Sequence, residues 1–361
     1  MIPETISEAL FVLKTSRCPE NVFGTDVADI KTVYRDWCKI VHEDLVPIPK
    51  KSVAHEAFLL LTKWWNFAET KISRGTYGDN RPTVLATFKT KTASYSISTL
   101  SQTGEMADLY EGETDKGASC LVKVCRSSKN NDLMKNEADI LAALPAKFSK
   151  PEHSFYFPNL LDSFEAQHGK MKIRINVFAN IDKIVRLTDV ISAFPNGIDI
   201  KDAAWMWNRI LESVHLFHSH GYIHTSITPD NFFLNLDTHQ GVLFDFCYAV
   251  ERKGAAKAFN YNFRHLYPPE IFAKKPLDFS TDLYMMANIM NLLLGGRVNG
   301  ENIFEIPIGI PIAVAGLLRS CRLGKAHRTN SAHELYEDFK EIRNALGWKK
   351  EFRQFSLVSK T

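Results

Sequence analysis

The sequence has no long hydrophobic run and little charge imbalance. Its longest apolar stretches, such as residues 57–61 and 308–318, are shorter than the roughly 18 residues that a membrane-spanning helix needs. The N-terminus lacks a basic region followed by an apolar core, so we expect a cytoplasmic protein with no membrane contact. The net charge of +3, from 44 basic and 41 acidic residues, does not indicate a nucleic-acid partner.

Cysteine is also rare, and the spacing of the cysteines matches no metal-binding or redox motif. The six cysteines form no Cys-x-x-Cys pair and no cluster with histidine, so the sequence predicts buried thiols rather than disulfides or a zinc site. The chain has 361 residues, of which 45% are apolar and 24% charged. These values are typical of a soluble globular protein with two or three domains.

Residues 1–78 contain two amphipathic segments. Apolar side chains recur at helical spacing from Ile30 to Val41, and again from Ala54 to Ala68 after a break with prolines. The tripeptide His42-Glu43-Asp44 lies between them. The arrangement resembles a J-domain, in which a His-Pro-Asp loop between two helices contacts a heat-shock ATPase. The resemblance implies such a chaperone as a partner of His42 and Asp44. Because Glu43 stands in place of the proline, the alternative is a module that serves only for docking or packing.

A second domain is predicted after a polar segment. Residues 79–92 are rich in turn-forming and polar side chains, which favours a linker. From residue 93 the pattern predicts three strands within 95–124, separated by polar turns and typical of a small antiparallel sheet. The turn between the first two strands contains one glycine, Gly104, followed by Glu105.

The stretch from Tyr222 to Asn235 and the later run from Phe244 to Cys247 resemble the catalytic loop and metal-binding strand of protein kinases. The resemblance implies that Asn231 and Asp245 are Mg²⁺ ligands and that His224 is structural. It further implies a glycine-rich turn at Gly104 near the nucleotide phosphates.

The residue expected to accept the substrate proton is absent. Ser226 stands where the kinase pattern has aspartate, and Thr228 stands where it has lysine. A hydroxyl accepts a proton far less readily than a carboxylate, so we expect phosphotransfer to be weak or lost. Asp230 and Asp237 are nearby carboxylates that could substitute.

Two charged residues complete the predicted nucleotide site. Lys123 matches the kinase lysine that contacts the phosphates, and Glu137 matches its ion-pair partner on the following helix, with Asp139 as the alternative. A lysine on an apolar strand needs such a carboxylate to remain charged when it is buried.

The resemblance extends to structural positions downstream. Glu270 and Arg328 match a kinase ion pair, and Asp282 matches an aspartate that binds backbone amides of the catalytic loop. The segment between Cys247 and Tyr267 contains no serine or threonine, so control by phosphorylation there is not expected, and only Tyr248 and Tyr261 are candidates.

The sequence therefore predicts an α+β chain: a bilobal protein-kinase-like fold, with a small antiparallel β lobe and a mainly helical lobe, preceded by an all-α J-domain-like helical hairpin. The expected divisions are the module 1–78, the linker 79–92, the small lobe 93–179, the large lobe 180–347 and an aromatic and basic tail 348–361. The same combination resembles a poorly characterised bacterial and phage group that carries an aspartate-aromatic-cysteine motif.

The expected function is that of a pseudokinase that binds ATP and Mg²⁺ weakly and regulates a protein partner through the J-like module or the large lobe. The alternatives are an active atypical kinase or other nucleotide-dependent transferase, and a chaperone adaptor that acts through His42 and Asp44. We expect the tail to pack on the large lobe rather than to bind a partner or nucleic acid.

Overall fold

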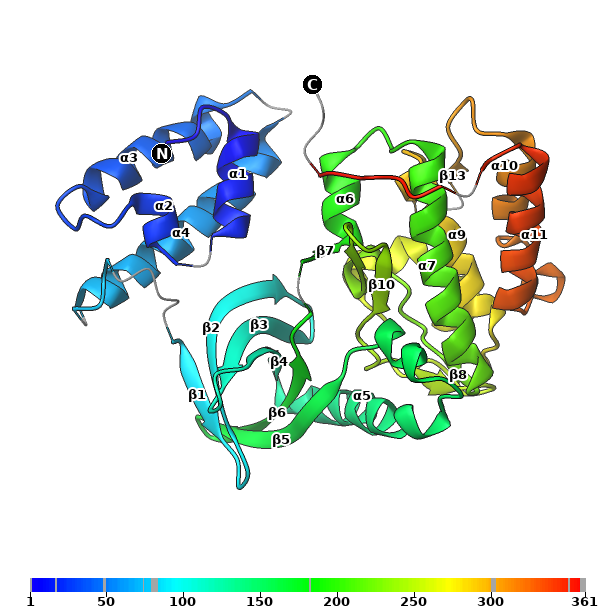
Figure 1. Cartoon of the computed structure of the whole chain (residues 1–361), viewed down its shortest axis with the longest axis horizontal. Helices are drawn as coiled ribbons and strands as arrows, with labels where there is room; N and C mark the ends of the chain where they lie inside the picture. Colours follow the sequence, from blue (N-terminus) through cyan, green and yellow to red (C-terminus); the bar gives the residue numbers. More distant parts are fainter. Residues whose placement is uncertain are drawn as a thin grey trace. The chain divides into compact units, whose positions relative to one another are not determined.

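A computed structural model describes residues 2–16, 18–47, 50–73, 75–78, 84–181, 183–299, 303–349 and 351–357. They form two compact units, one drawn from 1–102 and 109–119 and the other from 103–108 and 120–361 (Figure 1). Residues 79–83 of the predicted linker, and residues 350 and 358–361 of the predicted tail, lie outside the described residues.

The first unit begins with helices that enclose an apolar core. Their bounds are α1 (Ile6–Thr15), α2 (Glu20–Phe23), α3 (Ile30–Val41), the 3₁₀ helix η1 (Glu43–Leu45) and α4 (Lys51–Ser73). A capping box between Thr5 and Glu8 starts α1. The predicted helices correspond to α3 and α4. Helices α1 and α2 were not predicted, because most apolar residues of α1 form one run, residues 9–13, without helical spacing, and α2 has only four residues.

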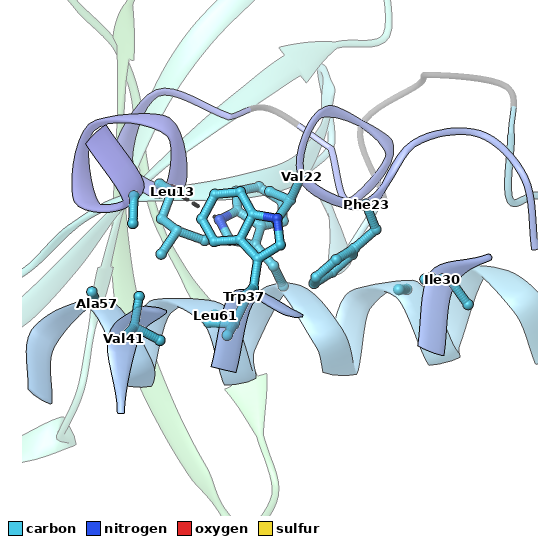
Figure 2. Close-up of a cluster of buried hydrophobic side chains, with 11 residues drawn as sticks. Leu13, Val22, Phe23, Ile30, Trp37, Val41, Ala57 and Leu61 are labelled. Carbon is cyan, nitrogen blue, oxygen red and sulfur yellow. Dashed lines mark hydrogen bonds between the residues drawn. The ribbon is translucent and has the colours of Figure 1, made fainter. Parts of the chain in front are cut away.

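Trp37 is fully buried at the centre of this core (Figure 2). Residues from all four α-helices surround it, including Leu13, Val22 and Leu61. The indole nitrogen of Trp64 donates a hydrogen bond of 2.8 Å to the Leu13 carbonyl, which ties α4 to α1. The helical module therefore has its own hydrophobic core.

Strands of the first unit follow: β1 (Ala86–Lys89), β2 (Ser94–Thr103) and β3 (Ala107–Thr114), adjacent in that order. β1 pairs antiparallel with β2, with Ala86 opposite Ile97. Part of the segment predicted as linker 79–92 is thus a strand. A four-residue strand has too few residues to show alternation, so only its pairing with β2 reveals it.

The second unit contains a β part and one helix packed on it. Its strands β4 (Ser119–Cys125), β6 (Met171–Ala179) and β5 (Leu160–His168) are antiparallel neighbours in that order, and Lys123 lies opposite Asn176. Helix α5 (Asn131–Ala143) contacts both β5 and β6.

The rest of the second unit is mainly helical. Its α-helices are α6 (Leu187–Ala193), α7 (Ile200–Ser219), α8 (Pro269–Phe272), α9 (Ser280–Leu293), α10 (Ile312–Ser320) and α11 (Ala332–Ala345). Helix α7 contacts α9 and α11 (Figure 1). Nearly every residue of α9 is buried, as expected for a central helix.

Short elements connect these helices. The strands are β7 (Ile184–Arg186), β8 (Tyr222–Ile223), β9 (Phe232–Asn235), β10 (Gln240–Leu243), β11 (Val250–Glu251), β12 (Arg297–Val298) and β13 (Phe304–Glu305). The 3₁₀ helices of this unit are η3 (Ser128–Asn130), η4 (Pro145–Lys147), η5 (Pro151–Tyr156), η6 (Pro229–Asn231), η7 (Tyr261–Leu266) and η8 (Lys325–His327). Within the described residues, no helix combines the length and apolarity that crossing a membrane requires.

The described part of the C-terminal tail packs on the helical region. Arg353 bonds both carboxylate oxygens of Asp202 on α7, at 2.6 and 3.1 Å. The Phe352 ring stacks on His239 with 4.1 Å between centroids, and His239 stacks in turn on Trp205 at 3.8 Å. Phe352 and Arg353 therefore attach this segment to the second unit.

Candidate nucleotide and phosphotransfer site

A buried cluster of charges forms around the ammonium group of Lys123. Its Nζ atom lies 2.9 and 3.1 Å from the two carboxylate oxygens of Glu137 and 2.8 Å from Oδ1 of Asp245. The Cys247 sulfur is 3.2 Å from the same nitrogen. Strand β4, helix α5 and the segment after β10 thus place the predicted lysine, glutamate and aspartate in one cluster.

The opposite charges of Lys123 and Asp245 stabilise each other's ionised forms. Burial would lower the pKa of Lys123, but the negative charges around it, first that of Asp245, raise the pKa well above its ordinary value. Burial would raise the pKa of Asp245, but Lys123 lowers it. Burial raises the pKa of the Cys247 thiol well above its usual range, so this side chain is a neutral thiol at pH 7.

Two asparagines that the sequence analysis missed hold the surroundings of the cluster. Asn176 donates 2.9 Å hydrogen bonds to Glu137 and to the Met134 carbonyl. Asn136 donates to the carbonyls of residues 246, 247 and 249 at 3.0–3.3 Å. No sequence signal marks either residue, because their partners are far away along the chain.

Glu137, Asp245 and Cys247 also have the donor atoms of a possible metal site, all within 4.8 Å of one another. The Lys123 ammonium contacts all three groups, so it already supplies the cation that they surround. Asp139, the alternative partner for Lys123, is exposed and instead pairs with Lys135 at 2.6 Å.

Ser226 lies in a second polar cluster. Its side chain is fully buried, and its hydroxyl is 3.2 Å from the Tyr267 hydroxyl and 3.1 Å from the Asn231 amide nitrogen. The Asn231 amide also donates 3.0 Å to the Ser226 carbonyl, which leaves the amide oxygen available as an acceptor. Tyr267 is another residue that the sequence analysis missed.

The nearby carboxylates have other partners. Asp230 accepts a hydrogen bond from Thr188, and Asp237 pairs with Lys183 at 3.2 Å on the surface. Neither Tyr267 nor Asn231 is a carboxylate. The hydrogen-bond partners of the Ser226 hydroxyl are therefore neutral groups.

Asp282 on α9 fixes the loop that carries Ser226. Its two oxygens accept 2.8 Å hydrogen bonds from the backbone nitrogens of His224 and Thr225, and His218 lies 2.8 Å from Oδ2. Thr225 has a φ of 60°, a conformation that is costly for a threonine. The buried carboxylate stabilises this backbone conformation because it satisfies both amides.

His224 and Phe246 connect this loop to the segment after β10. The rings meet edge-on, with 4.9 Å between centroids, and the His224 Nε2 is 3.0 Å from the Phe244 carbonyl. Burial lowers the pKa of His224, so the imidazole is neutral at pH 7. Asp245, between the two phenylalanines, has a φ of 63° and is held in that conformation by its contact with Lys123.

The geometry of the turn at Gly104 requires a glycine at this position. A Cβ atom at this position would lie 2.3 Å from the Ala107 carbonyl oxygen. The Gly104 amide donates to Asp108 at 3.3 Å, and its carbonyl accepts from Arg126 at 2.9 Å. The Glu105 carboxylate accepts a 2.8 Å hydrogen bond from the Tyr261 amide. The polar groups of this turn named above are therefore hydrogen-bonded to other residues of the protein.

Glu270 and Arg328 form a buried, two-pronged ion pair with N–O distances of 2.7 and 3.0 Å. His42 and Asp44 of the first unit are exposed, and the Asp44 amide donates 3.3 Å to the His42 ring nitrogen. These two residues belong to the first unit.

The solved structure of vaccinia related kinase 3 is similar to this chain, with a TM-score of 0.57 and 11% sequence identity. The match covers 74% of this chain and 92% of that chain. The fold is that of the protein kinases. No protein-family model and no curated protein matches the sequence.

Proposed function

We propose that this protein is a pseudokinase whose kinase-like fold binds Mg-ATP and acts as a regulatory or scaffold module. The observation that carries the proposal is the contrast between a complete Lys123 cluster and a Ser226 that has only neutral partners. The first arrangement suits nucleotide binding, and the second offers no base for the substrate hydroxyl.

The residues present are compatible with a bound metal and nucleotide. Asp245 and Asn231 offer a carboxylate and an amide oxygen, which are the hard ligands that Mg²⁺ prefers. Lys123 offers a charged ammonium that Glu137 holds in place. When bound, Mg²⁺ neutralises phosphate charge and ATP supplies the phosphoryl group. The side chains of this protein would orient the phosphates.

Two features support weak rather than tight binding. The amide of Gly104 is bonded to Asp108, so this backbone group is not available to a phosphate. Glu105 adds a negative charge in the same turn, which repels phosphate oxygens. We therefore expect ATP affinity to depend on Lys123 and the metal more than on the turn.

Calorimetry with ATP, with and without Mg²⁺, tests the proposal. We expect Mg²⁺-dependent binding by the wild type and loss of binding in Lys123→Ala and Asp245→Ala. Lys129→Ala, which removes an exposed lysine at a distance from the cluster, should bind like the wild type. Absence of wild-type binding at millimolar ATP would contradict nucleotide binding and leave only a scaffold role.

The retained Asn231 and Asp245 favour a second candidate, an active atypical kinase or related transferase without the usual base. Positioned acid-base groups typically contribute about 10²–10⁴-fold in rate, so phosphotransfer without one would be slow rather than impossible. Transfer of labelled phosphate by the wild type that disappears in Asp245→Ala would favour this candidate.

The exposed His42 and Asp44, between α3 and α4, are the basis for a third role as a chaperone adaptor. In this role a heat-shock ATPase would bind the module. Stimulation of ATP hydrolysis by such a chaperone, lost in His42→Gln with nucleotide binding unchanged, would support it. No stimulation would leave the module as a docking or packing element.

A further inference from the structure

A cationic pocket lies in the helical part of the second unit, among α8, α9, β13 and α10. It has a volume of about 630 Å³, which is within the usual range for ligand sites. Five basic residues and one acidic residue are among those that line it, namely Lys275, Arg319, Arg322, Lys325 and Arg328 with Glu270. None of these residues contacts the Lys123 cluster.

Some of this charge is neutralised within the protein. Arg328 is paired with Glu270, and Lys325 lies 3.3 Å from Asp278. Lys275, Arg319 and Arg322 have no carboxylate partner in the part of the chain that the structure describes. Three unpaired positive charges therefore remain at one pocket.

Arg322 is held in place by aromatic rings rather than by an acid. Its guanidinium lies 4.5 Å from the ring centroids of both Tyr284 and Phe304, and one nitrogen donates to Asn288. A guanidinium has five N–H donors, so most remain available for a ligand. Burial lowers the pKa of Arg322, an unfavourable effect that a bound anion would relieve.

An exposed apolar surface continues from the pocket along α10. Ile312, Gly316 and Arg319 have the spacing of one helix face, and all three are exposed. Ile312 is 89% exposed and the preceding Ile308 is fully exposed. A Cβ atom at Gly316 would meet no atom within 4 Å, so space is open beside the helix. Cationic and apolar surfaces thus follow one another along α10.

We propose that this pocket and the adjacent face of α10 bind a phosphorylated segment of a protein partner. A phosphate monoester carries a charge of about −1.5 to −2, which matches the unpaired cations better than a single carboxylate does. Arginine forks bind phosphate oxygens in pairs. An apolar residue of the same segment would cover Ile312. The elongated surface along a helix favours a peptide over a membrane.

The test uses the full chain and fluorescent peptides with a central phosphoserine flanked by leucines. Matched peptides contain serine or glutamate, and separate samples contain inorganic phosphate or vesicles of phosphatidylserine and phosphatidylcholine. We expect the phosphopeptides to bind at least tenfold more tightly than either matched peptide. We expect Arg319→Gln to leave Mg-ATP binding unchanged, which separates this binding from nucleotide binding.

Substitutions of pocket residues test whether the phosphopeptide binds at this pocket. Arg319→Gln and Arg322→Gln should each weaken phosphopeptide binding at least tenfold, whereas Lys170→Gln, with the same charge change at an exposed turn, should not. Arg319 is exposed and without a charged partner, so its substitution leaves the fold intact even where that of Arg322 does not. Ile312→Ser should weaken the phosphopeptide but not inorganic phosphate.

Several results would overturn the proposal. Equal binding of the serine and phosphoserine peptides would remove the phosphate from the interaction, and equal binding of the glutamate peptide would reduce it to general acidity. An equal effect of Lys170→Gln would attribute binding to net charge. Vesicle binding that depends on Arg319, without phosphopeptide binding, would assign this surface to a membrane.

Discussion

Two buried polar clusters of the second unit differ in their charge. Around Lys123, an ammonium group is balanced by two carboxylates. Around Ser226, a hydroxyl, an amide and a phenol form a neutral network. Both clusters have hydrogen-bonded side chains, so both are compatible with a stable fold. The difference teaches that one fold can bury balanced charges in one polar cluster and only neutral hydrogen-bonding groups in another.

The largest expected effect comes from restoring a carboxylate in the neutral cluster. The Tyr267 hydroxyl and the Asn231 amide can both donate to the side chain at position 226, so an aspartate there would be hydrogen-bonded. We expect Ser226→Asp to raise phosphate transfer from labelled ATP, measured on the chain itself and on a mixed histone substrate, by about 10²–10⁴-fold.

Ser226→Asn is the matched control. Asparagine has nearly the same size as aspartate, but its neutral amide cannot act as a base. An equal rise in both variants, or no rise in Ser226→Asp although ATP binds, would mean that the missing base is not what limits transfer.

The charged cluster is tested by removing one carboxylate. Glu137→Ala leaves Lys123 with less compensation in a buried site, and breaking such a pair typically costs about 3–5 kcal/mol. Denaturant unfolding should show this loss in the free energy of unfolding. Asp139→Ala, on the same helix but in an exposed pair with Lys135, should change it by less than about 1 kcal/mol. Similar losses in the two variants would disagree with a buried, mutually dependent cluster.

The C-terminal segment provides a smaller effect at the surface. Arg353→Ala removes the bonds to Asp202, but both side chains are partly exposed, so the expected loss of stability is about 1 kcal/mol or less. Thermal unfolding in low and high salt measures it, because screening should reduce the contribution. A loss as large as that of Glu137→Ala would show that the tail is essential to the fold.

The smallest effect concerns pH. The pKa of His224 is lower in the folded protein than in the unfolded chain, where it is about 6.5, so the unfolded chain binds more protons near pH 6. The contribution of His224 to stability is therefore complete above pH 6.5 and falls as the pH decreases through the folded-state value. His224→Asn should show a shallower decrease in the free energy of unfolding below pH 6.5 than the wild type; parallel curves would contradict this.

Some residues of the candidate site could be identified from the sequence and others could not. Lys123 and Glu137 were identified because their spacing and surroundings match a kinase pattern, and Asp282 was identified in the same way. Tyr267 and His218 were not, because nothing near them in the sequence indicates a partner. Strand β1 was taken as linker, since four residues without clear alternation give no signal until β2 lies beside them.

The sequence by itself determined the kinase-like fold and the presence of a serine, Ser226, where the kinase pattern has aspartate, because motif order and residue identity are local properties. Only the tertiary structure decided that Ser226 meets Tyr267 and Asn231, that the Gly104 amide is already bonded, and that Arg319 and Arg322 share a pocket with Lys275. Hydrogen bonds and charge interactions depend on distance in space, and residues far apart along the chain become neighbours only when it folds.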